Sequence, residues 1–311
     1  MTVASDAGPQ SRGFSLIGCL VSDDDARIAD MNDDQAVDTQ ADVVDEEAAH
    51  ASIRSELSDG ILTITLDRAA KGNALRPSDR QQVIALLQSA HETAAVRCVV
   101  LRAAGRHFCT GADVTGLRRT DAETVVGEVS RRIMGGAQQL IAAVLDCDKP
   151  VIAVVQGAAA GMGAHLALAA DFVIATEEAV FIESFVLRGI TVDAAGAYLL
   201  TRHLGMRKAK ELALLGDRLP AEDALRLGLV NWVVSGDDLA STVSALATRL
   251  AAAPTTALAL TKRLFNVALD QDRASSFAFE GLMQEAQSHS IDSTEGVAAF
   301  LENRAPVFRG V

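Results

Sequence analysis

Aromatic residues and cysteines are scarce in this sequence. Only 4% of the 311 residues are aromatic, with a single tryptophan and a single tyrosine. Proteins that hold single-stranded nucleic acid stack its bases on aromatic rings, so this scarcity argues against that class. The net charge of −13 excludes a basic nucleic-acid-binding surface. The cysteines form no CxxC pair and have no histidines at metal-binding spacing: Cys19, Cys98, Cys109 and Cys147. The sequence therefore predicts neither a metal site nor a disulfide framework.

Long apolar runs are also absent. The run Phe14–Val21 is too short for a signal peptide and is followed by three aspartates. The segment Val151–Ala175 is longer, but it contains Gln156, His165 and Asp171 besides three glycines, which a lipid-facing helix tolerates poorly. We interpret it as a strand, a glycine loop and a helix. We therefore expect a soluble, cytoplasmic protein whose partners include neither membranes nor nucleic acids.

The negative charge is concentrated at the N-terminus. The first 56 residues hold 13 Asp and Glu against 3 Lys and Arg, whereas the other 255 residues hold 28 against 25. The acidic stretch has no sustained hydrophobic period and too little apolar surface to offset the entropy of ordering. We expect residues 1–52 to form an acidic, disordered N-terminal extension. An upstream translation start that adds a leader without function explains the same pattern.

Strands and helices alternate after this extension. β-branched and aliphatic runs predict strands at Ile61–Leu66, Val96–Arg102, Val151–Val155, Phe172–Ala175 and Val180–Ile182. Apolar residues at helical spacing predict helices over Ser78–Glu92 and Val125–Leu145, and over most of the chain after residue 194. This alternation indicates an α/β core over residues 53–250, with ligand-binding loops at the carboxyl ends of its strands. A helical C-terminal segment, residues 251–311, follows.

Two loops rich in small residues follow predicted strands. The first is Gly105–Asp113, and the second is Gln156–Ala164, which leads into a helix. Neither is a phosphate-binding loop, because the first lacks the GK[ST] ending and the second reads GxxxGxG rather than GxGxxG. Each loop alone is explained by a tight strand–helix turn that packs small residues. Side by side, the two loops could aim two backbone N–H groups at one oxyanion.

Five stretches in the right order give the chain from about residue 57 a resemblance to the crotonase superfamily, the enoyl-CoA hydratase/isomerase family. The stretches are Ile64–Leu75, Gly105–Asp113, Lys149–Gly163, Ala221–Val230 and Glu295–Phe308. The resemblance implies a spiral of ββα turns and an acyl-CoA thioester as substrate. It also implies trimers or hexamers assembled through the C-terminal helices. No separate cofactor is implied, since coenzyme A is part of the substrate.

The resemblance also assigns site residues. It puts the oxyanion-hole amides on Ala112 and on Met162, a position where the family usually has glycine or another small residue. Two preorganised N–H donors stabilise the negative charge that a thioester oxygen gains when a neighbouring carbon loses a proton. Candidates for the phosphates of coenzyme A are Arg68, Lys71 and Lys262. Other contacts to the acyl-CoA fall on Gly72, Asn73, Ala74, Gly111, Asp113, Val114, Gly161, Gly163 and Phe185.

The chain departs from the hydratases of the family at both of their catalytic glutamates. The first glutamate position is His165 and the second is Phe185. Glu183, two residues earlier on the expected strand, lies about 6–7 Å away along it. We interpret Glu183 mainly as a solvated or pocket-rim carboxylate, with replacement of the lost acid as the alternative. For His165, direct proton transfer, a hydrogen bond in the pocket and a plain satisfied polar side chain all remain open.

A different carboxylate, Asp193, stands in the stretch Gly189–Gly196. Phenylalanine at the second glutamate position together with this aspartate resembles the branch that contains the ring-epoxide isomerase of aerobic phenylacetate breakdown. In the dienoyl-CoA isomerases of the family, an aspartate at this place takes part in proton shuttling. A single carboxylate beside an apolar pocket suits a 1,3-proton transfer, because it takes the proton as a base and returns it as an acid. The alternative is that Asp193 only caps the next helix.

Three functions are compatible with these residues. The preferred one is isomerisation of an unsaturated or ring acyl-CoA thioester, with Asp193 and His165 as the catalytic candidates and Ala112 and Met162 as the oxyanion hole. The second is hydration of a trans-2-enoyl-CoA, with Asp193 assisted by His165 or Glu183. The third is a non-catalytic acyl-CoA-binding module whose acidic arm recruits a partner.

The C-terminal helices predict self-association. They carry several large apolar residues that a single α/β layer could not cover: Phe265, Phe277, Phe279 and Phe300. Burying these side chains against neighbouring subunits stabilises them by about 25 cal/mol per Å². A homotrimer or a hexamer made of two trimers is therefore expected. The alternative is that the helices fold back on their own subunit.

Overall fold

The computed structural model describes residues 51–115 and 125–311. The chain divides into two compact units, Met1–His50 and Ala51–Val311, and all described helices and strands belong to the second. The expected disorder of the acidic extension concerns residues outside the described ranges. That expectation, and the domain boundaries at residues 52 and 250, stay predictions.

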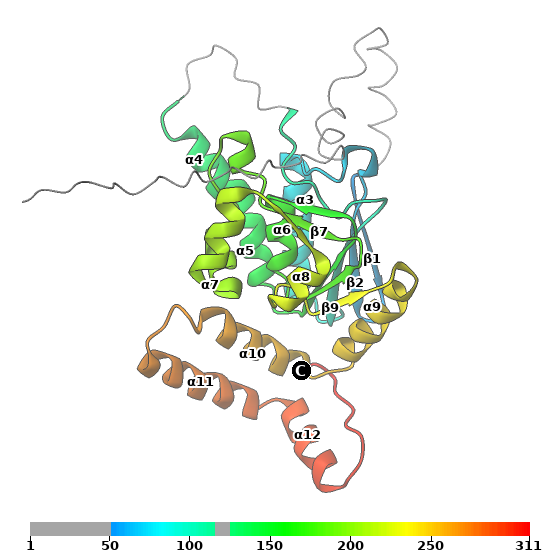
Figure 1. Ribbon diagram of the computed structural model, residues 1–311. Coiled ribbons are helices and arrows are strands. Elements are labelled where there is room, and N and C mark those ends of the chain that lie inside the picture. The colour runs from blue at the N-terminus through cyan, green and yellow to red at the C-terminus, as the bar shows by residue number, and fades with distance from the viewer. Residues whose placement is uncertain (1–50, 116–124) are drawn as a thin grey trace, which may run out of the picture. The chain divides into compact units, whose positions relative to one another are not determined.

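A six-stranded sheet forms the centre of the second unit (Figure 1). Its strands run in the order β1 (Ile53–Ser58), β2 (Ile61–Leu66), β3 (Cys98–Ala103), β4 (Val151–Val155), β6 (Phe172–Thr176) and β9 (Trp232–Val234). β1 and β2 form an antiparallel hairpin, and every later pair of neighbours is parallel. Parallel strands place their carboxyl ends, and the loops that follow them, along one edge of the sheet.

A second, three-stranded sheet positions the glycine loop. It has the order β5 (Ala158–Ala160), β7 (Val180–Ile182) and β8 (Arg218–Pro220). β5 pairs parallel with β7, and β7 pairs antiparallel with β8. Helix α6 (Met162–Leu168) begins two residues after β5, so this small sheet fixes where α6 begins.

Helices cover both faces of the six-stranded sheet. On one face, α3 (Pro77–Glu92), α5 (Gln139–Leu145) and α6 share the main core with alternate residues of β3 and β4: Val99, Leu101, Val151, Ala153 and Val155. On the other face, α9 (Gly236–Ala251) packs against the intervening residues: Cys98, Val100, Ile152 and Val154. Burial on both faces explains why β3 and β4 are apolar without a break, as is typical of parallel sheets.

The helix predicted over Val125–Leu145 is interrupted. A stretch of π-helix, η3 (Ile133–Gln138), separates α4 (Glu128–Arg132) from α5. This stretch contains Gly135 and Gly136. Short π-helical stretches are rare and occur frequently at functional sites.

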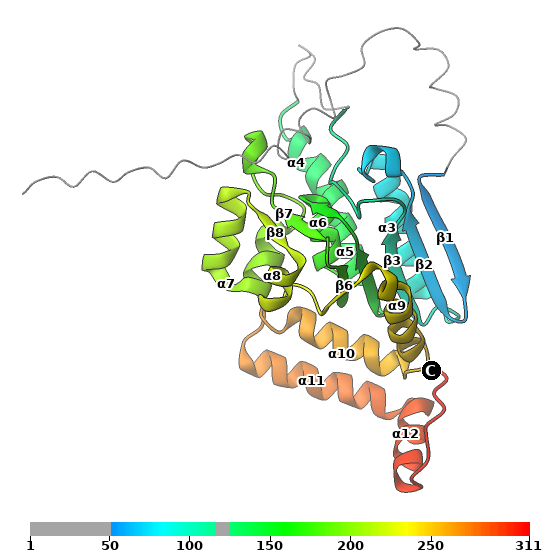
Figure 2. The same cartoon turned by 45° about the vertical axis from the view of Figure 1, so that its right-hand side comes forward.

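The remaining helices follow the small sheet. α7 (Gly196–Leu215) and α8 (Ala221–Arg226) lie near it, and α10 (Thr255–Val267), α11 (Arg273–Ser288) and α12 (Ile291–Leu301) extend away from the central sheet (Figure 2). The last three helices bear large exposed apolar side chains: Phe265, Leu269, Phe277, Leu282, Phe300 and Leu301. Within residues 51–115 and 125–311, no single helix has the length and apolar character needed to cross a membrane. Together α9 and α10 have that length and apolar character, but the two helices meet at a bend of 103°.

A buried ion pair attaches α10 to the rest of the unit. Lys262 Nζ donates to Asp171 Oδ2 at 2.8 Å and to the carbonyl oxygen of Val144 at 3.1 Å, and the Lys262 side chain is 8% exposed. Asp171 Oδ2 also accepts a hydrogen bond from the Val151 N–H at 2.7 Å. Lys262 is therefore a poor candidate for a phosphate of coenzyme A, because its ammonium group is already bonded inside the subunit.

Lys262→Met should lower the free energy of unfolding by about 3–5 kcal/mol, because it leaves Asp171 as an unpaired buried charge. Equilibrium unfolding in urea measures this loss. Lys208→Met is the matched control, since it breaks an exposed pair with Glu211 and should cost less than about 1 kcal/mol. Equal losses in the two variants would contradict the importance of the buried pair.

Candidate active site

The two small-residue loops lie against each other. The Cys109 N–H donates to the Ala158 carbonyl oxygen at 3.2 Å, and the Ala160 N–H donates to the Cys109 carbonyl oxygen at 2.9 Å. Gly163 approaches the same residue so closely that a Cβ on it would lie 2.2 Å from the Cys109 oxygen. No side chain fits at Gly163 without moving one of the loops. The sequence prediction of two adjoining loops is thus matched by their packing.

The N–H groups of Ala112 and Met162 lie close to this junction. A Cβ built on Gly111, which precedes Ala112, would be 3.9 Å from the Met162 nitrogen. Met162 is the first residue of α6, so its N–H has no partner within the helix. Among the backbone hydrogen bonds of the described residues, none has the N–H of Ala112 or Met162 as its donor. The junction therefore offers two unused donors, as an oxyanion hole requires.

His165 and Glu183 form a buried pair between α6 and the end of β7. Their Nε2 and Oε2 atoms are 3.0 Å apart, and the side chains are 0% and 6% exposed. Phe185 stacks on the imidazole, with 5.5 Å between ring centroids and 11° between planes. A Cβ on Gly196 would lie 2.2 Å from His165 Cε1, so the start of α7 encloses the ring. The interpretation of Glu183 as a solvated or pocket-rim carboxylate is wrong, because His165 holds it inside the protein.

Asp193 lies half-buried just before α7. Ala194 and Ala195, which follow it, have φ angles of +46° and +61°. Left-handed backbone at two consecutive alanines is strained, and such strain is concentrated at functional sites. Burial raises the pKa of Asp193, and attraction to His165 and Arg80 offsets part of this rise. The alternative that Asp193 caps α7 is wrong, because the N-cap residue is Ala195 and no side chain caps the helix.

Comparison with known proteins identifies the family. A family model described as "Enoyl-CoA hydratase/isomerase" matches residues 56–311. The chain belongs to the enoyl-CoA hydratase/isomerase family. Its resemblance to the crotonase superfamily and the expected α/β fold with a helical C-terminal segment are both confirmed.

Relatives in this family carry names for two reactions. The chain is 39% identical over 264 residues to a protein of Rhodobacter capsulatus named "Probable enoyl-CoA hydratase", covering 84% of this chain and 99% of the relative. It is 36% identical to the 1,2-epoxyphenylacetyl-CoA isomerase of Escherichia coli, covering 83% and 98%. The crystal structure of an enoyl-CoA hydratase from Polaromonas sp. JS666 superposes with a TM-score of 0.77 at 35% identity, covering 83% of this chain and 100% of the other.

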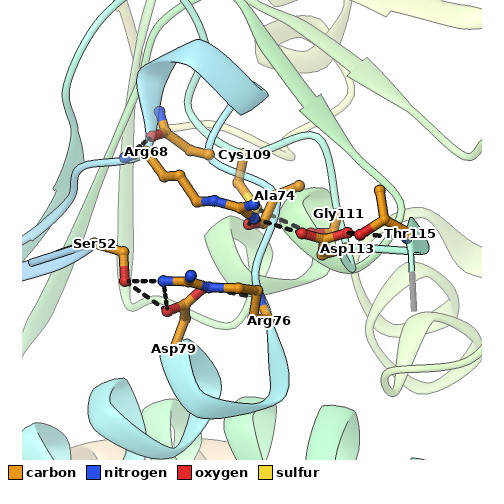
Figure 3. Close-up of polar contacts among 10 residues, drawn as sticks. Ser52, Arg68, Ala74, Arg76, Asp79, Cys109, Gly111, Asp113 and Thr115 are labelled. Carbon is orange, nitrogen blue, oxygen red and sulfur yellow. Dashed lines mark hydrogen bonds and ion pairs between the residues drawn. The ribbon is translucent and has the colours of Figure 1, made fainter. Parts of the chain in front are cut away.

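A salt bridge organises the stretch where the family resemblance places coenzyme A (Figure 3). Arg68 Nη1 donates to Asp113 Oδ2 at 2.5 Å and to the Ala74 carbonyl oxygen at 3.2 Å. Burial alone would raise the pKa of Asp113, but hydrogen bonds from Thr115 and Arg68 hold it at about 2. Asp113 is therefore ionised at neutral pH. Because Arg68 already binds this internal carboxylate, it is a poor candidate for the phosphates of coenzyme A.

Asn73 in the same stretch has an internal role. It is buried, its Oδ1 accepts from the Arg68 N–H at 2.8 Å, and its Nδ2 donates to the carbonyl oxygens of Ala104 and His107 at 2.9 and 2.7 Å. The Asn73 side chain therefore has no spare donor for a ligand. Lys71 and Val114 are exposed and remain available.

A second polar cluster fixes the start of α3 (Figure 3). Ser52 Oγ donates to Asp79 Oδ1 at 2.6 Å, and Arg76 Nη2 donates to Ser52 Oγ at 2.9 Å. The Arg76 N–H donates to Asp79 Oδ2 at 2.8 Å. Ser52, which the sequence prediction places in the extension, is buried in this cluster. A shortened chain should therefore begin at Ala51 to keep α3 in place.

Sequence reasoning missed Arg80, one residue further along α3. Arg80 is 8% exposed. Burial raises the pKa of Asp193, and attraction to the Arg80 guanidinium offsets part of that rise. Val83 and Ile84, which follow Arg80 by three and four residues, are buried. Residues at this spacing share one face of a helix. An arginine on the apolar face of the predicted helix was therefore the sequence signal for a buried charge.

Proposed function

We propose that this family member isomerises an unsaturated or ring acyl-CoA thioester, with Asp193 carrying the proton. The observation that carries the proposal is the contrast in burial beside the two loops. Asp193 is half-buried, whereas His165 and Glu183 are enclosed and bonded to each other. Asp193 is therefore the acid–base group best able to reach a substrate. The isomerase name of the Escherichia coli relative supports the same reaction class.

The proposed chemistry needs one carboxylate and two N–H donors. On a 3-enoyl thioester, ionised Asp193 takes a proton from the α carbon, and the C–H electrons move toward the carbonyl group. The N–H groups of Ala112 and Met162 stabilise the negative charge that collects on the thioester oxygen. The protonated Asp193 then returns the proton to the γ carbon, which leaves the double bond conjugated with the thioester. The balanced reaction consumes no water and needs no cofactor.

The acyl-CoA is proposed to lie along the two loops. Phe185 and the backbone of Gly161 and Gly163 would line the acyl end, and the stretches on either side of the Arg68–Asp113 pair would hold the coenzyme. The residues assigned to the coenzyme are Lys71, Gly72, Asn73, Ala74, Gly111, Asp113 and Val114. For Asn73 the contact is with its backbone, since its side chain is fully bonded.

Hydration of a trans-2-enoyl-CoA is the second candidate. The His165–Glu183 pair favours it, because an imidazole oriented by a carboxylate is a common general base. Within the described part of the chain His165 Nδ1 has no hydrogen-bond partner, so in the tautomer whose Nε2 donates to Glu183 it is an unused acceptor nitrogen. The hydratase name of the Rhodobacter capsulatus relative also agrees with this reaction.

Product masses after incubation with a panel of 2-enoyl, 3-enoyl and ring acyl-CoA thioesters test the proposal. Isomerisation leaves the mass unchanged and moves the double bond, which ultraviolet absorbance of the conjugated thioester detects. A product heavier by one water would favour the hydratase. Binding of the thioesters without any product would favour a non-catalytic module.

The rate of isomerisation should fall in mildly acidic solution. Asp193 must be ionised to take the first proton, so its protonated form is inactive. Because burial raises its pKa above the ordinary 3.8, protonation begins at a higher pH than for an exposed aspartate, and kcat/KM should fall as pH drops through that raised value. A pH–rate profile whose acid limb has its midpoint below 3.8 would contradict this assignment.

Self-association through the C-terminal helices is also proposed. Phe265 and Phe300 are 77% and 81% exposed in the single chain, which is unfavourable unless a partner covers them. A chain that begins at Ala51 should keep its activity and show the mass of a trimer or hexamer by light scattering. A fully active monomer would refute the assembly, and an unfolded short chain would show that the extension is needed.

A further inference from the structure

Among the residues that the structure describes, the buried guanidinium of Arg80 has no acceptor at hydrogen-bond distance. The residue is 8% exposed, and its Nε has no hydrogen-bond partner. Across residues 51–115 and 125–311, its guanidinium takes part in no ion pair. Guanidinium stays protonated in proteins and has five donors, and an unpaired buried ion is strongly unfavourable. We propose that Arg80 binds a carboxylate or another acceptor oxygen of the acyl group, at the end of that group remote from the thioester. This proposal rests on the proposed function.

The neighbouring arginine on the same helix shows what is missing at Arg80. Arg76, four residues earlier, donates to Asp79 at 3.0 Å from Nε and to Ser52 from Nη2. The chain thus supplies Arg76 with internal acceptors and supplies Arg80 with none, although Arg80 is the more buried of the two. Asp79 is next to Arg80 in the sequence but is already occupied by Arg76.

The position of Arg80 points to the acyl end of the site. Its guanidinium lies over Gly136 of the π-helical stretch, where a Cβ would be 3.5 Å from Nη2 and 3.6 Å from Nε. Because residue 136 is glycine, it places no side chain against the guanidinium at this point. Among the nearby charges, Arg132 repels Arg80, whereas Asp193 and Asp79 attract it. Asp193 is in turn close enough to His165 to be attracted by it, and His165 stacks on Phe185.

The local charges favour an anionic or strongly accepting oxygen. Arg80 and Arg132 contribute two positive charges, and Asp193 and Asp79 contribute two negative ones. Asp79 is already bonded to Arg76, and Asp193 gives up its charge each time it holds a proton. A carboxylate on the substrate would accept two parallel hydrogen bonds from Arg80, the bidentate geometry that guanidinium prefers. It would also leave Asp193 free for the proton transfer. Acyl-CoA thioesters with an apolar end would instead bury Arg80 unpaired.

Calorimetric binding of saturated thioesters tests this proposal without requiring turnover. The probes are the mono-CoA thioesters of succinic, adipic and suberic acids, each compared with the butyryl, hexanoyl or octanoyl thioester of the same length, and free coenzyme A. We expect at least one dicarboxylic thioester to bind at least about tenfold more tightly than its monocarboxylic partner. Arg80→Met should remove this preference and leave the binding of free coenzyme A unchanged.

Two further variants keep the result interpretable. Arg80→Lys keeps the positive charge but loses the planar guanidinium, so it should retain part of the preference for dicarboxylic thioesters. Arg249→Met, at an exposed position on α9, should leave all the affinities unchanged. If Arg80→Met does not fold, the preference is judged on Arg80→Lys and Arg80→Gln, and full retention in the glutamine variant would overturn the proposal. Equal affinity of the two thioester series, or weaker binding of free coenzyme A by Arg80→Met, would also overturn it. Failure of the isomerase assay alone would refute the proposed reaction and leave this binding result standing.

Discussion

Asp193→Asn is expected to lower kcat for isomerisation by about 10²–10⁴-fold, the usual contribution of one positioned acid–base group. Asparagine has almost the same shape as aspartate but can neither take nor return the proton. The loss should appear in kcat more than in KM, because Asp193 acts on the reacting carbons rather than on the coenzyme. The rate is measured as the rise in absorbance when a 3-enoyl thioester becomes conjugated.

The fold should survive this substitution. The Asp193 side chain makes no capping bond to α7, so the variant loses no helix cap. Asp237→Asn, at an exposed position in the first turn of α9, is the matched control and should keep the wild-type rate. Isomerisation by Asp193→Asn within about tenfold of wild type would rule out Asp193 as the proton carrier.

Met162→Pro should lower kcat by about 10²–10³-fold, because proline has no N–H and one oxyanion-hole donor disappears. Met162 is the first residue of α6, and the first position of a helix is where proline is best tolerated. The thioester oxygen would then lose one of the two hydrogen bonds that strengthen as charge develops on it. Steady-state kinetics on the same 3-enoyl thioester measures the effect.

Met162→Ala separates the backbone from the side chain. It keeps the N–H and removes the thioether, so it should stay within about tenfold of wild type for kcat while changing the preference for acyl length. Circular dichroism and thermal unfolding show whether each variant is folded. A folded Met162→Pro enzyme with the wild-type rate would contradict the placement of the oxyanion hole.

Four strands of the central sheet could be predicted from the sequence, because they are β-branched and aliphatic runs; β1 and β9 were not foreseen. The strands at Ile61–Leu66 and Val151–Val155 have the predicted bounds, as does Val180–Ile182 in the three-stranded sheet. β5 was not foreseen, since Ala158–Ala160 has no β-branched residue and owes its conformation to pairing with β7. The break at Ile133–Gln138 was also missed, because helical spacing of apolar residues continues through it.

The candidate site could be predicted only in part. Its loops were recognisable, since glycine positions reflect close backbone contacts that small residues permit. The partner of Glu183 was not, because His165 lies 18 residues away and meets it through the pairing of β5 with β7. The helix cap proposed for Asp193 failed for a local reason: Ala194 and Ala195 adopt left-handed backbone and move the start of α7 to Gly196. Arg80 was overlooked because charged residues in helices are usually solvated.

In the proposed reaction one carboxyl group both takes the proton and returns it. A 3-enoyl thioester deuterated at the α carbon, converted in ordinary water and stopped within a single turnover, tests this claim directly. Mass spectrometry of the product measures how much deuterium has reached the γ carbon. The wild-type enzyme should transfer a measurable fraction of the label, because Asp193 is half-buried and holds the deuteron near the substrate. Complete loss of the label to water would contradict it, since the proton taken from the α carbon would then not be the one returned to the γ carbon.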